Sequence, residues 1–201
     1  MNTVNQYILN TVAKSRPGSI FFNGDFRGFG SEAAIKTTLS RLVKEDMLER
    51  IAKGIYVKPK MDPDFGKTYP PLEQIAQALA EREHVRIRPA GTYAINILGL
   101  SQQVPTKLVY ITDGPPRTIK LGRRTIVFKP TTAKKLALKG EISGLIILAL
   151  EELGKEAVTP EMIERIKDLL KKESPEILNE DMKRASGWIS DLLFKIQKDV
   201  Q

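Results

Sequence analysis

Apolar and polar positions in the first sixty residues follow helical and strand-like patterns in turn. Residues 3–14 place their apolar side chains on one helical face, and residues 32–45 repeat this at spacings of three and four. Ser31 precedes the second segment and is a typical helix N-cap. The runs MLERIA and GIYVKP flank Lys53-Gly54, which predicts a two-stranded hairpin. Between the two helices, a short apolar run predicts a strand and FRGF a helical turn.

The pattern changes twice further along the chain. The segment PKMDPDFGKTYPP contains four prolines and one glycine, and we expect a linker at 61–70. Residues 71–135 combine helical segments with three β-rich runs, KLVYIT, RTIKL and RTIVFK, which predict an α+β domain with antiparallel strands. Residues 136–201 are strongly helical, with two helix starts in which Pro-Glu follows Thr159 or Ser174.

The order of elements in residues 1–60 is typical of a winged helix-turn-helix DNA-binding domain. In that arrangement the capped helix is the recognition helix and the hairpin is the wing. We therefore expect an α+β protein. Its N-terminal winged helix-turn-helix is followed by a small mixed α/β domain and by a helical C-terminal tail.

Charge is distributed unevenly along the chain, whose net charge is +8. Residues 1–60 hold 10 Lys or Arg against 5 Asp or Glu, and residues 61–135 hold 12 against 6. The remaining residues hold 10 against 13. A basic body with a mildly acidic tail suggests a polyanionic partner for the body. Charge alone leaves open that the chain is basic for no specific reason.

The predicted recognition helix carries polar and cationic residues on the side opposite its apolar stripe. Arg41 is suited to a bidentate contact with guanine, whereas Lys36 and Lys44 are suited to phosphates. Thr37 and Ser40 are short enough to let the helix backbone approach DNA closely. Lys53 and Lys58 on the hairpin, and Arg16 after the first helix, extend the predicted DNA-binding set. The simpler alternative is an amphipathic helix whose charged face is merely solvated.

A second group of cations lies in the β-rich region. Its members, near one predicted turn, are Arg117, Lys120, Arg123 and Arg124. They could extend a DNA footprint, or grip RNA or an acidic protein. They could equally be the charges that keep edge strands from pairing with other chains.

Catalytic chemistry finds little support. There is no cysteine and a single histidine, His84, so no His-based triad or Cys-ligated metal site exists. Asp62 and Asp64 resemble paired metal-binding acids, but they lie in the proline-rich segment. We expect a non-enzyme without cofactor or metal. The chain has no apolar run of membrane-spanning length and no secretory signal, so we expect a cytoplasmic protein without membrane contact.

Two segments together resemble a known family. SEAAIKTTLSRLVKEDMLERIAKGIYVKP resembles the N-terminal winged-helix segment of the AbiEi antitoxins of type IV toxin–antitoxin systems. It shares a Ser-led helix ending in Leu-x-x-Leu, here Leu39 and Leu42. It also shares the wing pattern with Arg50, Gly54 and Tyr56. TYAINILGLSQQVPTKLVYITDGPPRTIKLGRRTIVFKP resembles the β-rich region that follows in such regulators, so the likeness covers about residues 1–135.

The resemblance implies a DNA-binding transcriptional regulator that acts as antitoxin and autorepressor. Its expected partners are promoter DNA with inverted repeats and a nucleotidyltransferase-like toxin. The alternative function is a protein- or RNA-binding adaptor with a vestigial winged helix. The chain could act as a monomer or as a homodimer.

Overall fold

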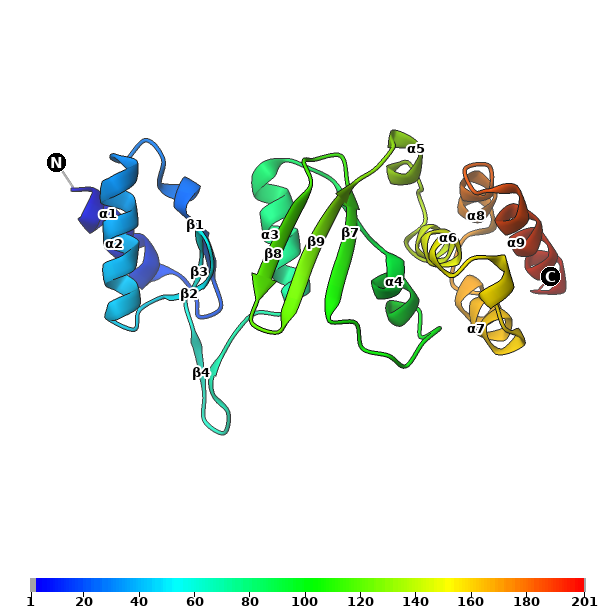
Figure 1. Cartoon of the computed structure of the whole chain (residues 1–201), viewed down its shortest axis with the longest axis horizontal. Coiled ribbons are helices and arrows are strands. Elements are labelled where there is room, and N and C mark those ends of the chain that lie inside the picture. Colours follow the sequence, from blue (N-terminus) through cyan, green and yellow to red (C-terminus); the bar gives the residue numbers. More distant parts are fainter. Residues whose placement is uncertain (1–2, 201) are drawn as a thin grey trace. The chain divides into compact units, whose positions relative to one another are not determined.

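A computed structural model describes residues 3–200 and divides the chain into two units (Figure 1). Unit 1 comprises the chain up to Ala78 together with Lys120–Gly122, and unit 2 comprises Leu79–Ile119 and the chain from Arg123 onward. The protein combines helices with several sheets and has a helical C-terminal part. The boundary therefore differs from the predicted linker at 61–70 and falls after Ala78.

Unit 1 contains the elements expected from the pattern of its first sixty residues. They are α1 (Val4–Lys14), β1 (Ile20–Phe22), the 3-10 helix η1 (Asn23–Phe26), α2 (Glu32–Lys44), β2 (Glu49–Ala52) and β3 (Ile55–Val57). The strands form one antiparallel sheet in the order β1-β3-β2. The Ser31 side chain accepts a hydrogen bond from the Ala34 backbone N–H at 3.2 Å, which confirms Ser31 as the N-cap of α2.

The proline-rich segment forms a second hairpin instead of a linker. Its strands are β4 (Lys60–Asp62) and β5 (Gly66–Thr68). Asp62 Oδ1 accepts the backbone N–H groups of Asp64 at 3.0 Å and Phe65 at 3.1 Å, and Gly66 has φ of +71°, which favours glycine. The expected linker is thus wrong, because the aspartate and the glycine build a turn that lets the two flanking strands pair.

Two side-chain contacts hold this hairpin to the rest of unit 1. Lys67 Nζ lies 2.6 Å from Asp46 Oδ1, and the Tyr69 hydroxyl donates to Glu49 Oε2 at 2.6 Å. The bond to Glu49, together with burial, raises the pKa of Tyr69 to about 12. These contacts connect β5 and the residue after it to Asp46, which lies between α2 and β2, and to Glu49, the first residue of β2.

Unit 2 is built around a four-stranded sheet and a group of helices. After α3 (Leu72–Glu83), which spans the boundary between the units, come β6 (Ile87–Ala90), α4 (Gly91–Ile97), β7 (Lys107–Thr112), β8 (Arg117–Leu121) and β9 (Arg124–Pro130). They are followed by α5 (Ala133–Leu136), α6 (Glu141–Leu153), the 3-10 helix η2 (Lys155–Ala157), α7 (Pro160–Leu170), α8 (Pro175–Met182) and α9 (Gly187–Val200).

The sheet has the order β6-β7-β9-β8, and β7 pairs with β9 in parallel. The predicted all-antiparallel arrangement is therefore wrong. Pro115 and Pro116 follow β7 and have no N–H to continue a ladder, so the chain passes on to β8 before β9 returns beside β7. Asp113 in this connection accepts two bonds from Arg86, one from the backbone and one from Nε, both at 2.7 Å.

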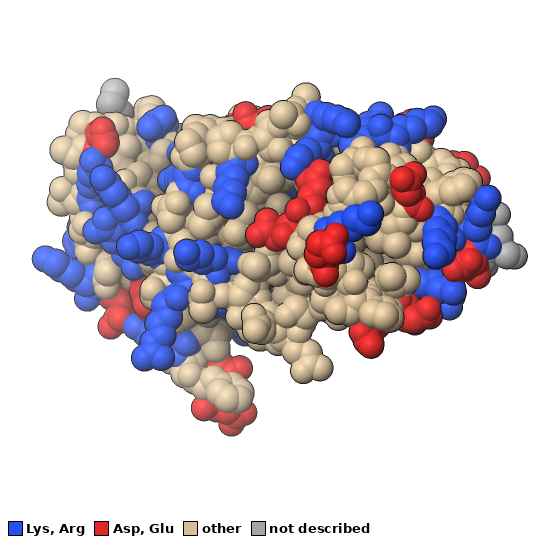
Figure 2. Space-filling view, turned by 45° about the vertical axis from the view of Figure 1, so that its right-hand side comes forward, with Lys and Arg blue, Asp and Glu red and all other residues tan. Residues whose placement is uncertain are grey.

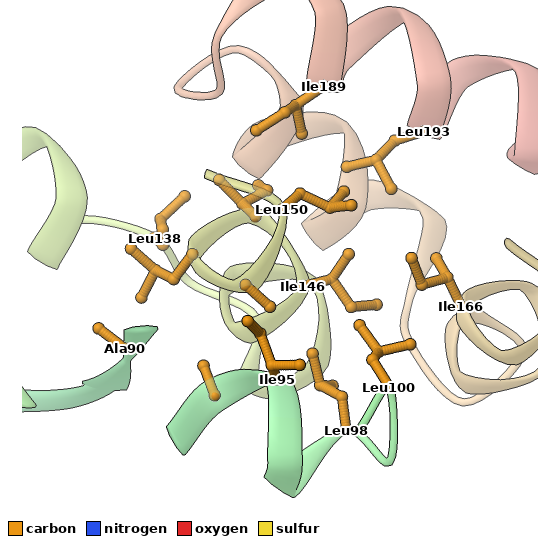
Figure 3. Close-up of a cluster of buried hydrophobic side chains, with 14 of the residues drawn as sticks. Ala90, Ile95, Leu98, Leu100, Leu138, Ile146, Leu150, Ile166, Ile189 and Leu193 are labelled. Atoms are coloured by element: carbon orange, nitrogen blue, oxygen red, sulfur yellow. The ribbon is translucent and has the colours of Figure 1, made fainter. Parts of the chain in front are cut away.

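One apolar core joins the strands of unit 2 to its C-terminal helices. Helix α6 lies at its centre, where Ile146 and Leu150 contact α4, α7 and α9 (Figure 3). The labelled partners in that view include Ile95, Ile166 and Leu193. Residues 71–135 and 136–201 therefore share a core instead of forming the separate regions that we expected.

A buried polar network fixes the start of α6. Asp181, which is fully buried, accepts bonds from the Lys139 N–H at 2.7 Å, the Gly140 N–H at 2.9 Å and the Ser143 hydroxyl at 2.6 Å. Arg88 of β6 donates to the carbonyl oxygens of Leu138 and Gly140. The Gly140 N–H, at the N-cap of α6, thus finds an acceptor that the helix itself does not provide. Among residues 3–200, no helix combines the length and apolar character needed to cross a membrane.

Replacing Asp181 with Ala is expected to destabilise the protein by about 3 kcal/mol, because buried N–H and O–H donors lose their acceptor. Denaturant unfolding of the full chain measures this. The exposed Asp168→Ala is the control and is expected to change stability far less, since its partner Lys171 is also exposed. Equal effects of the two changes would contradict the network's role.

The pKa of Tyr69 offers a second test. Because this pKa is raised on folding, the bond to Glu49 contributes stability at pH values below about 10 and loses it as the pH rises through about 12. Ring-carbon NMR titration, with Tyr69→Phe used to assign the signal, should give a midpoint near 12 that falls towards 10 in Glu49→Gln. A Tyr69 titration midpoint near 10 in the unchanged protein would show that the bond between Tyr69 and Glu49 is absent in solution.

Candidate nucleic-acid interface

Helix α2 separates its residues into a buried side and an exposed side. Ile35, Leu39 and Leu42 are at most 2% exposed and pack in the core of unit 1 with residues of α1. The exposed side carries Lys36, Thr37, Ser40, Arg41 and Lys44. The predicted solvent exposure of these five side chains is confirmed.

Two of the cations on this side pair with acidic residues four positions away, one at the start of α2 and one at its C-cap. Lys36 Nζ lies 2.5 Å from Glu32 Oε1, and Arg41 Nε lies 3.4 Å from Glu45 Oε1. The bond from Lys36 and its charge hold the pKa of Glu32 below the usual range. Such exposed pairs contribute at most about 1 kcal/mol, so a phosphate or a base edge can replace them.

Arg41 also contacts the first helix. Its Nη2 donates a hydrogen bond to Oδ1 of Asn5 on α1. The guanidinium is thus oriented from two sides, by Asn5 and by Glu45. Sequence reasoning missed Asn5, because no local pattern links positions that lie 36 residues apart.

The hairpin β2–β3 is short and its end is fixed. The turn is Lys53-Gly54, as predicted, and Gly54 has φ of +75°. The Gly54 carbonyl oxygen accepts the N–H of Asn23 in η1 at 3.2 Å. Lys53 remains exposed at the turn, where it can reach a partner.

Lys58 has a different role from the predicted one. Its ammonium group donates to the carbonyl oxygens of Val12 at 2.8 Å, Ala13 at 2.9 Å and Ser15 at 2.8 Å. These bonds use all three donors and place a cation at the C-terminal end of α1, where the helix dipole favours it. We therefore remove Lys58 from the candidate interface.

Other cations of unit 1 are exposed. Arg16 follows α1 and lines an open groove with Lys60, Tyr69 and three prolines. Arg27 precedes α2, and Arg50 lies on β2; both are exposed and were not among the predicted DNA-binding residues. Figure 2 shows Lys and Arg side chains gathered on unit 1 at the left of that view.

Only part of the second basic group is free to contact a partner. Arg117 pairs with Glu83 of α3 and is half-buried. Lys120, Arg123 and Arg124 are exposed around the turn between β8 and β9, where Gly122 has φ of +60°. These three side chains are suited to an anionic partner, whereas Arg117 has a structural contact within unit 2.

Within residues 3–200, no three His, Asp or Glu side chains group in a way that could hold a metal ion. Asp62 instead caps the turn of the β4–β5 hairpin, as its bonds to two backbone N–H groups show.

Comparison with known proteins identifies the family. A model of DUF6088, described as a family of unknown function, matches residues 7–178. The chain belongs to the DUF6088 family. A search of curated proteins gives no match for this family member.

A solved structure is similar in fold to this DUF6088 protein. It is the crystal structure of the RV2827C protein from Mycobacterium tuberculosis, with a TM-score of 0.50 and 16% sequence identity. The match covers 94% of this chain and 76% of that one. At this identity the similarity concerns the fold alone.

The role of Lys58 can be separated from DNA contact. Lys58→Met should lower the stability of unit 1 by about 1–2 kcal/mol, since the last carbonyls of α1 lose their donor. At temperatures where the variant is folded, its affinity for DNA should stay within about twofold. Thermal unfolding and fluorescence anisotropy measure the two effects. The matched Lys53→Met should weaken DNA binding and leave the stability of unit 1 unchanged. An equal loss of DNA affinity in both variants would return Lys58 to the interface.

Proposed function

We propose that unit 1 is a winged helix-turn-helix that binds double-stranded DNA, and that the protein is a transcriptional regulator. The observation that carries this proposal is the two-sided character of α2. Its apolar stripe is buried, while Lys36, Arg41 and Lys44 are exposed on one continuous side with Thr37 and Ser40.

The dimensions of α2 suit the major groove. Its 13 residues give a helix roughly 20 Å long, and the groove of B-DNA is about 12 Å wide. The short hairpin β2–β3 follows α2 directly, as a wing follows a recognition helix. Lys53 at its turn can then meet the phosphate backbone beside the groove.

Residue chemistry assigns the roles. Arg41 can form a bidentate contact with guanine, which is worth about 1–3 kcal/mol of discrimination. This exceeds the value of its exposed pair with Glu45. Lys36, Lys44, Lys53 and Arg16 contact phosphates, which position the protein without reading sequence.

The narrower role rests on the resemblance to AbiEi antitoxins. We include in the proposal that the protein represses its own promoter and counteracts a nucleotidyltransferase-like toxin. Co-expression with a neighbouring toxin gene tests that role. Toxicity that persists in the presence of this protein would contradict the antitoxin role without affecting DNA binding.

One observation favours the adaptor alternative. Both Lys36 and Arg41 already have acidic neighbours, which reduces the positive potential of α2. Salt dependence separates the two functions. Four phosphate contacts would give a slope of roughly −3 to −4 in log affinity against log salt, whereas apolar docking of a protein would give a slope near zero.

Two substitutions on α2 should have different effects. Arg41→Ala should lower the ratio of specific to nonspecific binding by about 1–3 kcal/mol, because it removes a base contact. Lys44→Ala should weaken binding to all sequences alike and reduce the salt slope by about one. Gel shifts with the protein's own upstream DNA and with a scrambled duplex measure both effects.

The exposed Lys172→Ala, on unit 2, serves as the matched control and should leave both quantities unchanged. Full affinity for upstream DNA in both α2 variants would show that α2 is not the recognition helix.

A further inference from the structure

The β4–β5 hairpin exposes apolar side chains that unit 1 does not cover. Phe65 at its turn is 83% exposed and Met61 on β4 is 68% exposed. Asp62 and Asp64 flank these apolar groups, so the turn is both acidic and apolar. The hairpin extends away from the three-stranded sheet of unit 1, and acidic side chains lie at its end (Figures 1 and 2).

A groove of complementary character lies at the base of the same hairpin. It is open, with a volume of about 490 Å³. Arg16 and Lys60 supply its positive charge, and Pro17, Tyr69, Pro70 and Pro71 supply apolar surface. Arg16 is exposed, and the ring of Tyr69 is held in place by the bond from its hydroxyl to Glu49.

The strand register places Lys60 and Asp62 on the same face of the hairpin, and Lys60 on that face lines the groove. Lys60 pairs with Thr68, and Asp62 pairs with Gly66, so these residues share one face. Lys60 lies at the base and Asp62 near the turn, about 7 Å further along the strand. A hairpin with the cation of Lys60 at its base and the carboxylates of Asp62 and Asp64 near its turn is complementary to a copy of itself turned by a two-fold axis.

We propose that this face binds a second copy of the chain. The two hairpins lie antiparallel across a two-fold axis. The turn of each copy, with Asp64 and Phe65, enters the groove of the other, formed by Arg16, Lys60 and the prolines. The interface is isologous, because each copy contributes the same turn and the same groove.

The charges of the turn and of the groove favour a second copy of the chain as the partner. The carboxylates at the turn repel phosphates, so nucleic acid is disfavoured there. Arg16 and Lys60 of another copy attract these carboxylates. Phe65 is the main apolar group that each copy contributes, so the dimer should be weak and dissociate in the micromolar range. The proposal does not depend on DNA binding, because its readout is the oligomeric state alone. In the dimer, Arg16 pairs with a carboxylate of the other copy in place of a phosphate.

Sedimentation equilibrium of the full chain over about 1 to 200 µM tests the proposal. The unchanged protein should shift from monomer to dimer over this range. Phe65→Ser should raise the dissociation constant about tenfold or more, and Asp64→Lys and Arg16→Glu should each do the same. Asp64 is chosen because Asp62 is needed for the turn. Combining Asp64→Lys with Arg16→Glu should restore dimerisation, because the reversed charges again face each other.

Val104→Ser is the matched control for Phe65→Ser, since Val104 is 76% exposed on unit 2, and it should leave the dimer intact. Circular dichroism confirms that each variant is folded. A monomer at every concentration would overturn the proposal. So would a dimer that none of the three single changes weakens, or one that the combined charge swap fails to restore.

Discussion

Burial of one side of α2 fixes which side chains that helix exposes to solvent. Ile35, Leu39 and Leu42 are almost fully buried against α1, and each contributes about 1.5–3 kcal/mol by leaving water. The exposed ion pairs on the other side are worth at most about 1 kcal/mol each. The core therefore sets the orientation of the helix, and the surface pairs can be exchanged for a ligand without loss of the fold.

Local signals in the sequence predicted local structure well. Ser31 caps α2 through a side-chain bond, and Lys53-Gly54 forms the turn of a hairpin, because both features depend on neighbouring residues. Helical periodicity likewise predicted which side of α2 is exposed. Lys58 could not be assigned in this way, because the carbonyl oxygens that it binds lie more than forty residues earlier in the chain.

The sequence predictions failed mainly where the structure depends on contacts between residues far apart in the chain. The parallel pairing of β7 with β9 depends on the path that the chain takes between them, which strand propensity does not determine. The proline-rich segment was expected to be a linker, yet Asp62 and Gly66 turn it into a hairpin. The shared core of unit 2 became visible only in the contacts of α6. Buried Asp181 gave no signal in the sequence, because an acidic residue in a helix usually indicates an exposed position.

We propose that the exposed side of α2 contacts DNA. Backbone amide NMR of the full chain, with and without a duplex from its own upstream region, is the decisive experiment. We expect the largest shifts at Thr37, Ser40 and Arg41, with smaller ones at Lys53. Shifts confined to unit 2, with α2 unchanged while DNA is bound, would contradict it.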